Sequence, residues 1–158
     1  MPELSSKPRV ALGADHAGFP IKETIRQFLQ NAGYPVDDLG TWSEESVDYP
    51  DYGKAVGECV AAQKDVFGIA VCGTGIGISI AANKVRGIRA AVAHDVSTAR
   101  LAREHNDANV LALGGRVVND KQAIEMVQAF LNTPFLGGRH ARRVEKITLI
   151  EQDERKRN

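Results

Sequence analysis

The feature that most constrains this 158-residue chain is the glycine-rich loop Cys72-Gly-Thr-Gly-Ile-Gly77. The apolar run 66–71 before it is rich in β-branched residues and predicts a buried strand. Residues 78–84 after it can form a helix. A glycine-rich joint between strand and helix can turn backbone N–H groups toward an anion, and the helix start adds partial positive charge. The loop is therefore a candidate anion cradle that also carries a thiol and a hydroxyl group.

The loop does not match two familiar phosphate-binding motifs. No Gly-Lys-Ser/Thr closes it, so it is not a Walker A loop. Its glycines are spaced G-x-G-x-G, one residue shorter than the dinucleotide fingerprint, and they follow the third predicted strand. Taken alone, the loop is equally compatible with a ligand site and with a tight structural connection. The residues that lie around it are needed to distinguish the two.

Strands and helices alternate along the whole chain. Strands are predicted at 9–13, 35–39, 66–71, 89–93 and 109–113, and helices from about 20, 51, 78, 95 and 120, with a charged helix after residue 140. Asp95 and Asp120 are predicted helix caps, and the short strand 35–39 is expected near a sheet edge. No repeat or linker divides residues 1–158. We therefore expect one α/β domain whose parallel sheet is covered on both faces.

Polar residues gather where the predicted strands end. In parallel sheets ligands bind beyond the carboxyl ends of the strands. This rule places Asp15 and His16, the glycine loop, and the segment 114–116 with Arg116 at one edge. A helix cap and a surface histidine are the alternative interpretation of Asp15 and His16. Their convergence with the glycine loop favours a ligand site.

A basic cluster lies near the C-terminus. Arg139 and Arg143 are four residues apart and share one helical face, with Arg142 beside them. Forked guanidinium groups suit phosphate. A solvated face with Glu145 as a partner is the alternative. Together with the glycine cradle, the arginines indicate a phosphorylated small molecule.

The histidines give weaker signals. His105 and Asn106 suit a helix C-terminus as well as they suit a site. His94 and His140 have no such context and are expected to be structural or rim groups. None of the histidines has metal-ligand spacing, so we expect no metal site.

Composition excludes several other classes. The formal net charge is zero, so nothing indicates nucleic acid or a membrane as a partner. No run of about 18 apolar residues predicts a membrane helix, and residues 1–8 lack the apolar segment of a signal peptide. Cys59 and Cys72 form no Cys-x-x-Cys pair, and Cys59 is expected to be a small core residue. We expect a cytoplasmic protein.

Five motifs together resemble the type B ribose-5-phosphate isomerase family, which also includes galactose-6-phosphate and allose-6-phosphate isomerases. They are Gly-Ala-Asp15-His16-Ala-Gly, Val-Asp-Tyr49-Pro-Asp, the loop from Cys72 to Gly77, Glu-His105-Asn106 and Gly-Gly-Arg139-His-x-Arg-Arg143. The resemblance extends from about Val10 to Ile147. The N-terminal residues 1–8 and the charged residues 151–158 are expected to be peripheral tails.

The resemblance implies a Rossmann-like, three-layer α/β/α sandwich with a five-stranded parallel sheet of order 2-1-3-5-4. It also implies interconversion of ribose 5-phosphate and ribulose 5-phosphate, a step of the pentose phosphate pathway, through ring opening and a cis-enediolate. No cofactor is implied.

The resemblance also implies a role for each site residue. Cys72 is the base that removes the C2 proton, Thr74 passes a proton between two substrate oxygens, and His105 opens the furanose ring. A thiolate at a helix start is chemically sensible, and loop N–H groups can meet the enediolate. The implied substrate-binding residues are Asp15, His16, Tyr49, Gly73, Gly75, Ile76, Gly77, Asn106, Arg116, Arg139 and Arg143. One branch of the family carries a carboxylate base slightly downstream, but Ile78 follows the loop here, which favours the cysteine branch.

The positions of Cys72 and His105 lead us to expect a site built from two chains. Helix 95–105 starts at the ligand edge and runs back, which places His105 about 15 Å from that edge of its own chain. The resemblance supports a homodimer or a dimer of dimers with shared active sites. Which chain supplies Arg116 stays open.

Two alternatives remain at this point. A hexose 6-phosphate isomerase would use the same motifs, with the phosphate one carbon further out. A non-catalytic nucleotide-binding module would use the glycine loop and leave Cys72 inert.

Overall fold

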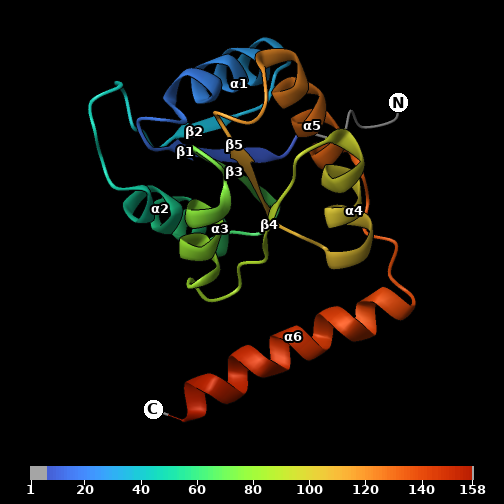
Figure 1. Ribbon diagram of the computed structural model, residues 1–158. Helices are drawn as coiled ribbons and strands as arrows, with labels where there is room; N and C mark the ends of the chain where they lie inside the picture. Colours follow the sequence, from blue (N-terminus) through green and yellow to red (C-terminus); the bar gives the residue numbers. More distant parts are fainter. Residues whose placement is uncertain (1–6, 158) are drawn as a thin grey trace.

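The computed structural model describes residues 7–157, so residues 1–6 and 158 of the expected tails lie outside the described residues. The strands are β1 (Arg9–Ala14), β2 (Val36–Asp38), β3 (Val66–Cys72), β4 (Ala90–Val92) and β5 (Val110–Gly114). They form one parallel sheet of order β2-β1-β3-β5-β4 (Figure 1). The predicted α/β class and strand order are confirmed.

Helices cover both faces of this sheet. Within the described residues they are α1 (Phe19–Asn31), α2 (Tyr49–Ala61), α3 (Ile76–Asn83), α4 (Val96–Asn106), α5 (Asp120–Asn132) and α6 (Arg139–Lys156). Helices α1, α4 and α5 pack on one face, and α2 and α3 pack on the other. No helix within residues 7–157 combines the length and apolar character needed to cross a membrane.

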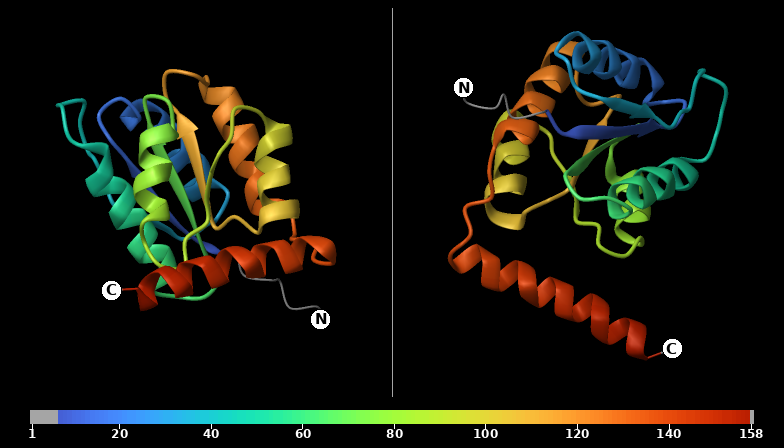
Figure 2. Two further views of the ribbon diagram at one scale, coloured as in Figure 1. Left: turned by 60° about the horizontal axis from the view of Figure 1, so that its bottom comes forward. Right: turned by 180° about the vertical axis from the view of Figure 1, so that it is seen from behind.

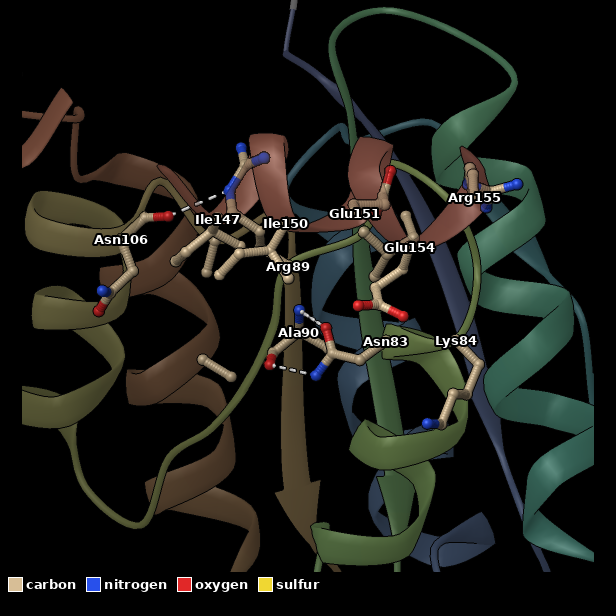
Figure 3. Close-up of a pocket in the computed structure, with 13 residues that line it drawn as sticks. Asn83, Lys84, Arg89, Ala90, Asn106, Ile147, Ile150, Glu151, Glu154 and Arg155 are labelled. Atoms are coloured by element: carbon tan, nitrogen blue, oxygen red, sulfur yellow. Dashed lines mark hydrogen bonds between the residues drawn. The ribbon is translucent and has the colours of Figure 1, made fainter. Parts of the chain in front are cut away.

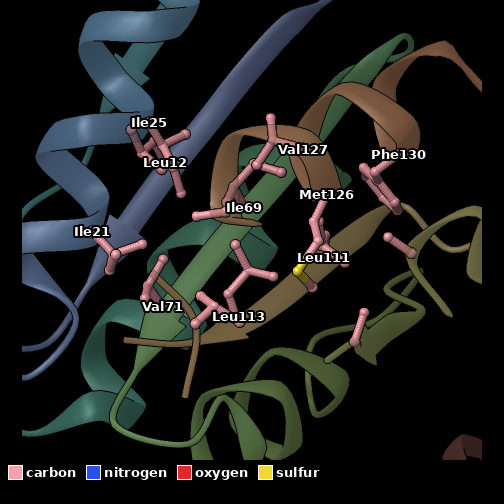
Figure 4. Close-up of a cluster of buried hydrophobic side chains, with 14 of the residues drawn as sticks. Leu12, Ile21, Ile25, Ile69, Val71, Leu111, Leu113, Met126, Val127 and Phe130 are labelled. Carbon is pink, nitrogen blue, oxygen red and sulfur yellow. The ribbon is translucent and has the colours of Figure 1, made fainter. Parts of the chain in front are cut away.

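Alternation along the central strands explains the two layers of core. Successive strand residues point to opposite faces, and here one set is large and the other small. The face under α1, α4 and α5 carries Leu12, Ile69, Val71, Leu111 and Leu113 (Figure 4). The other face carries Ala11, Ala70 and Ala112. Gly68 belongs to the small set, and a Cβ there would lie 2.7 Å from Val56 of α2. The small residues therefore let α2 and α3 approach the sheet closely.

The helix caps confirm one prediction and correct another. Asp95 accepts a hydrogen bond from the Thr98 N–H at 2.7 Å and caps α4, as predicted. Asp120 does not cap α5, because it is already the first helical residue. Asn119, in extended conformation, accepts the Gln122 N–H at 2.8 Å instead. Two adjacent residues could both act as caps, and the backbone conformation selects between them.

Helix α6 lies apart from the three layers. Figure 2 shows it crossing the end of the domain opposite the tip of the β5 arrow. It carries exposed Ile147, Leu149 and Ile150. Glu151 accepts the Gly87 N–H at 3.1 Å, and the helix continues to Lys156. Most of the expected C-terminal tail is thus the last part of α6.

Candidate active site

Cys72 ends β3 opposite Gly114 and is buried. Its Sγ accepts a hydrogen bond from the Gly75 N–H at 3.2 Å. This geometry requires Gly75 in the left-handed region at φ 81°, where a Cβ would also lie 2.8 Å from the carbonyl carbon of Leu113. Helix α3 begins at the next residue, two residues earlier than the predicted helix. The sulfur therefore lies beside both a backbone N–H donor and the start of a helix.

The neighbouring loop residues are also engaged. The Ile76 N–H donates to Thr74 Oγ1 at 3.2 Å, which holds the hydroxyl group beside the helix start. Two N–H groups of the predicted cradle, those of Gly75 and Ile76, are thus directed at side chains of the loop itself. Gly73 and Gly77 carry the other glycine N–H groups of the predicted cradle.

The ends of the two neighbouring strands complete this edge. Asp15 follows β1, is buried, and accepts the Gly18 N–H at 3.0 Å just before α1. The Arg116 N–H donates to Gly73 O at 3.0 Å. The Arg116 guanidinium lies over the same glycine, because a Cβ on Gly73 would be 3.3 Å from Arg116 Nη1. Arg116 therefore belongs to the glycine loop of its own chain.

Two residues from the 40–50 region reach the same edge. His16 Nδ1 lies 3.1 Å from the Val47 N–H, which donates to it. Tyr49 is the first residue of α2, and its ring packs against Gly77, where a Cβ would be 2.6 Å from Tyr49 Cζ. Gly77 is thus required for the close approach of the tyrosine ring.

The remaining predicted residues lie at the opposite edge. Asn106 O accepts a hydrogen bond at 3.1 Å from Arg89, which immediately precedes β4. Cys72 is level with Gly114, at the far end of β5. The predicted site therefore divides into two groups. The strand-end group contains Asp15, His16, Tyr49, Cys72, Gly73, Thr74, Gly75, Ile76, Gly77 and Arg116, and the helix-end group contains His105, Asn106, Arg139 and Arg143.

His140 joins the helix-end group, whereas the sequence analysis predicts only a structural or rim position for it. Its ring stacks on that of His105 with centroids 4.2 Å apart and planes at 12°. Burial lowers the pKa of His140, followed by the positive charges of His105, Arg139 and Arg143, while Glu104 opposes them. Residues 105 and 140 are far apart in sequence, so no local pattern predicts this stack.

A cavity of about 940 Å³ lies between α6 and the start of β4 (Figure 3). Its lining includes Asn83, Arg89, Asn106, Ile147 and Glu151. It borders the helix-end group through Asn106 and does not include Cys72. This cavity is thus at the edge opposite the thiol.

The second cysteine differs from Cys72. Cys59 was expected in the core but is only half-buried on α2, with Sγ 3.8 Å from Asp37 Oδ2. Burial raises the pKa of the Cys59 thiol, and the Asp37 carboxylate raises it further. Across residues 7–157, no three His, Cys, Asp or Glu side chains gather as a metal site would require.

Comparison with known proteins identifies the family. The family model described as Ribose/Galactose Isomerase matches residues 10–147. The chain belongs to this family. It is 51% identical over 144 residues to ribose-5-phosphate isomerase B of Escherichia coli (strain K12), a match covering 91% of this chain and 97% of that protein. The predicted family and isomerase class are confirmed.

Solved structures agree with this assignment. Ribose-5-phosphate isomerase B of Clostridium thermocellum matches with TM-score 0.90 and 53% identity, covering 92% of this chain and 99% of that one. The enzyme of Mycoplasma genitalium, solved with bound ribulose-5-phosphate, matches with TM-score 0.88 and 40% identity, covering 91% and 96%. This isomerase therefore shares both fold and sequence with these relatives.

Proposed function

We propose that this isomerase interconverts ribose 5-phosphate and ribulose 5-phosphate. The observation that carries the proposal is the buried Cys72 thiol at the head of a glycine loop, with Asp15 and Arg116 on the flanking strand ends. The relative solved with ribulose-5-phosphate supports the same substrate pair.

Catalysis begins with ring opening. His105 gives a proton to the ring oxygen and takes the proton from the C1 hydroxyl as the bond between C1 and the ring oxygen breaks, which yields the open-chain aldehyde. An imidazole is suited to both halves of this transfer because it titrates near neutral pH. Asp15 and Asn106 hold sugar hydroxyls.

Cys72 then acts as the base. Its thiolate removes the proton from C2, and the electron pair forms the C1–C2 double bond of a cis-enediolate. Backbone N–H groups of Gly73 and Gly77 stabilise the negative oxygen. Thr74 passes a proton between the two substrate oxygens, and the Cys72 thiol returns its proton to C1 to form the ketose.

The phosphate is held by polar and charged side chains from both groups. His16 and Arg116 contribute from the strand-end group, and Arg139 and Arg143 contribute from the first turns of α6. Bidentate guanidinium groups favour a phosphate dianion over a neutral hydroxymethyl group. A non-phosphorylated sugar should therefore bind poorly.

Two chains are needed to assemble this site. The strand-end and helix-end groups lie at opposite edges of one sheet, so one chain does not bring them together. A two-fold dimer that places the helix-end group of each chain against the glycine loop of the other gives two equivalent sites. The exposed Ile147 and Ile150 of α6 supply apolar surface beside the helix-end group.

A substrate panel tests the proposal. Ketose formation should be measured with ribose 5-phosphate, allose 6-phosphate, galactose 6-phosphate and unphosphorylated ribose, with Cys72→Ala protein as the inactive control. We expect the highest kcat/KM for ribose 5-phosphate. Preference for a hexose phosphate would show that the substrate is a hexose 6-phosphate and not ribose 5-phosphate. Tight adenine-nucleotide binding without isomerisation would overturn the enzymatic proposal.

A further inference from the structure

The proposed chemistry leaves a buried charge unused. Lys22 of α1 is fully buried and is among the largest fully buried side chains in residues 7–157. Its Nζ lies 2.7 Å from Asp38 Oδ1 and 3.2 Å from Glu23 Oε1. A buried ammonium persists only when it is paired, and such a pair adds little stability over apolar packing. Stability alone therefore does not account for the Lys22–Asp38 pair.

Asp38 connects Lys22 to the loop that follows β2. The same Oδ1 atom accepts the Gly40 N–H at 3.0 Å. Gly40 O in turn accepts the Ala14 N–H at 2.7 Å, and the Thr41 N–H donates to Ala14 O at 2.7 Å. The loop thus begins clamped to the last residue of β1, directly before Asp15.

The far end of this loop contacts the proposed phosphate-binding residue His16 and leads into the proposed pocket residue Tyr49. Val47 donates its N–H to His16 Nδ1, and Tyr49 packs on Gly77. Between the two anchors the loop is largely exposed, with Trp42 68% accessible. The position of His16 and Tyr49 therefore depends on where the loop starts.

We propose that Lys22 and Asp38 form a positioning pair for substrate binding. The pair fixes Gly40, and Gly40 fixes the loop 40–48 against β1. The loop then orients the His16 ring through the Val47 N–H and sets the position of Tyr49 at the start of α2. This inference rests on the proposed function. Neither Lys22 nor Asp38 touches the substrate, and Cys72 lies on another strand, so binding rather than the proton transfer should respond to their loss.

Trp42 gives a readout that does not depend on catalysis. It is the only tryptophan of the chain. Its ring lies against Gly40, where a Cβ would be 3.0 Å from the ring. Acrylamide quenching and fluorescence anisotropy of this tryptophan therefore report the order of the loop at the residue that Asp38 holds.

The test compares Lys22→Met with Ile25→Val. Both change fully buried positions of α1, and Ile25 belongs to the hydrophobic core beneath the helix. Lys22→Met should increase acrylamide quenching and raise KM for ribose 5-phosphate about tenfold, within the range that small misplacements of binding groups produce, while kcat stays within about threefold. Ile25→Val should leave the quenching and KM unchanged.

Asp38 supplies a second variant should Lys22→Met fail to fold. Asp38 is partly accessible, so its truncation leaves a less severe defect. Asp38→Asn keeps an oxygen for the Gly40 N–H, whereas Asp38→Ala does not. We expect Asp38→Ala to raise KM and to increase acrylamide quenching of Trp42. Asp38→Asn should return both quantities most of the way to the parental values.

The outcomes separate the two proposals. A loosened loop with unchanged KM, or an unchanged loop in both Lys22→Met and Asp38→Ala proteins, would overturn the positioning role and leave the proposed function standing. A parent protein that isomerises no sugar phosphate would overturn the proposed function and the role in substrate binding with it. The fluorescence result would still decide whether the pair restrains the loop.

Discussion

Mixing two inactive variants, Cys72→Ala and His105→Ala, tests whether the active site is shared between chains. The two edges of the sheet set the distance to be bridged within one chain. Cys72 is paired with Gly114 at one end of β5. Ala90 follows Arg89, which donates a hydrogen bond to Asn106, and Ala90 is paired with Val110 at the other end of β5. Four strand residues span about 13 Å. A hydrogen bond needs a separation of about 3 Å, so one chain cannot place both side chains on one sugar.

Subunit exchange gives this experiment a defined yield. In an equal mixture half of the dimers contain one chain of each kind, and each of these has one site with both lesions and one intact site. Recovery should therefore reach about a quarter of the parental activity, given two equivalent sites per dimer. Activity should be assayed after exchange, with heterodimers counted by native mass spectrometry.

A matched mixture provides the control. Asp15→Ala and Cys72→Ala both alter the strand-end group, so every site of their heterodimer carries one lesion and no recovery is expected. Absence of recovery in the first mixture despite proven heterodimers would refute the shared site. A fully active monomer, or equal recovery in both mixtures, would do the same.

Three further predictions follow from the site. Cys72→Ala should lower kcat by about 10² to 10⁴-fold while calorimetry still detects substrate binding, and a variant within tenfold of the parent would exclude Cys72 as the base. Gly77→Ala should displace the half-exposed Tyr49 ring and raise KM while lowering stability by less than about 1 kcal/mol; an unchanged KM would remove Tyr49 from the pocket. Because the pKa of His140 is lowered in the folded state, the unfolded chain binds protons more readily. Its contribution to stability is therefore present above the ordinary pKa of 6.5 and is lost as pH falls below it. Urea unfolding between pH 7.5 and 5.5 should show this slope, and a His140→Gln variant with the same slope would contradict it.

Local patterns predicted the elements better than their ends. The β-branched run before Cys72 predicted β3, because the burial of a central strand is visible in a short stretch of sequence. The start of α2 was placed at 51, whereas the helix begins at Tyr49, with Pro50 in its first turn. Proline is favoured in a first turn but also ends loops, so the sequence alone does not fix the boundary.

The candidate site shows the same limit over longer distances. The strand-end group was predictable because carboxyl ends of parallel strands meet at one edge. The His105–His140 stack was not, since it depends on how α6 leaves the domain. Lys22 was also missed, because a lysine beside Ile21 resembles an ordinary polar position until Asp38 is placed against it. A charge that is buried only by tertiary contacts does not alter the periodic pattern of apolar residues, so that pattern does not reveal it.

The two margins of the sheet are its shortest strands. β2 and β4 have three residues each, whereas the strands between them have five to seven. Short edge strands offer few unpaired backbone groups for another chain to extend. The protein is thereby protected against edge-to-edge aggregation. Copies of this chain should consequently associate through helices and loops, leaving each five-stranded sheet closed to further strands.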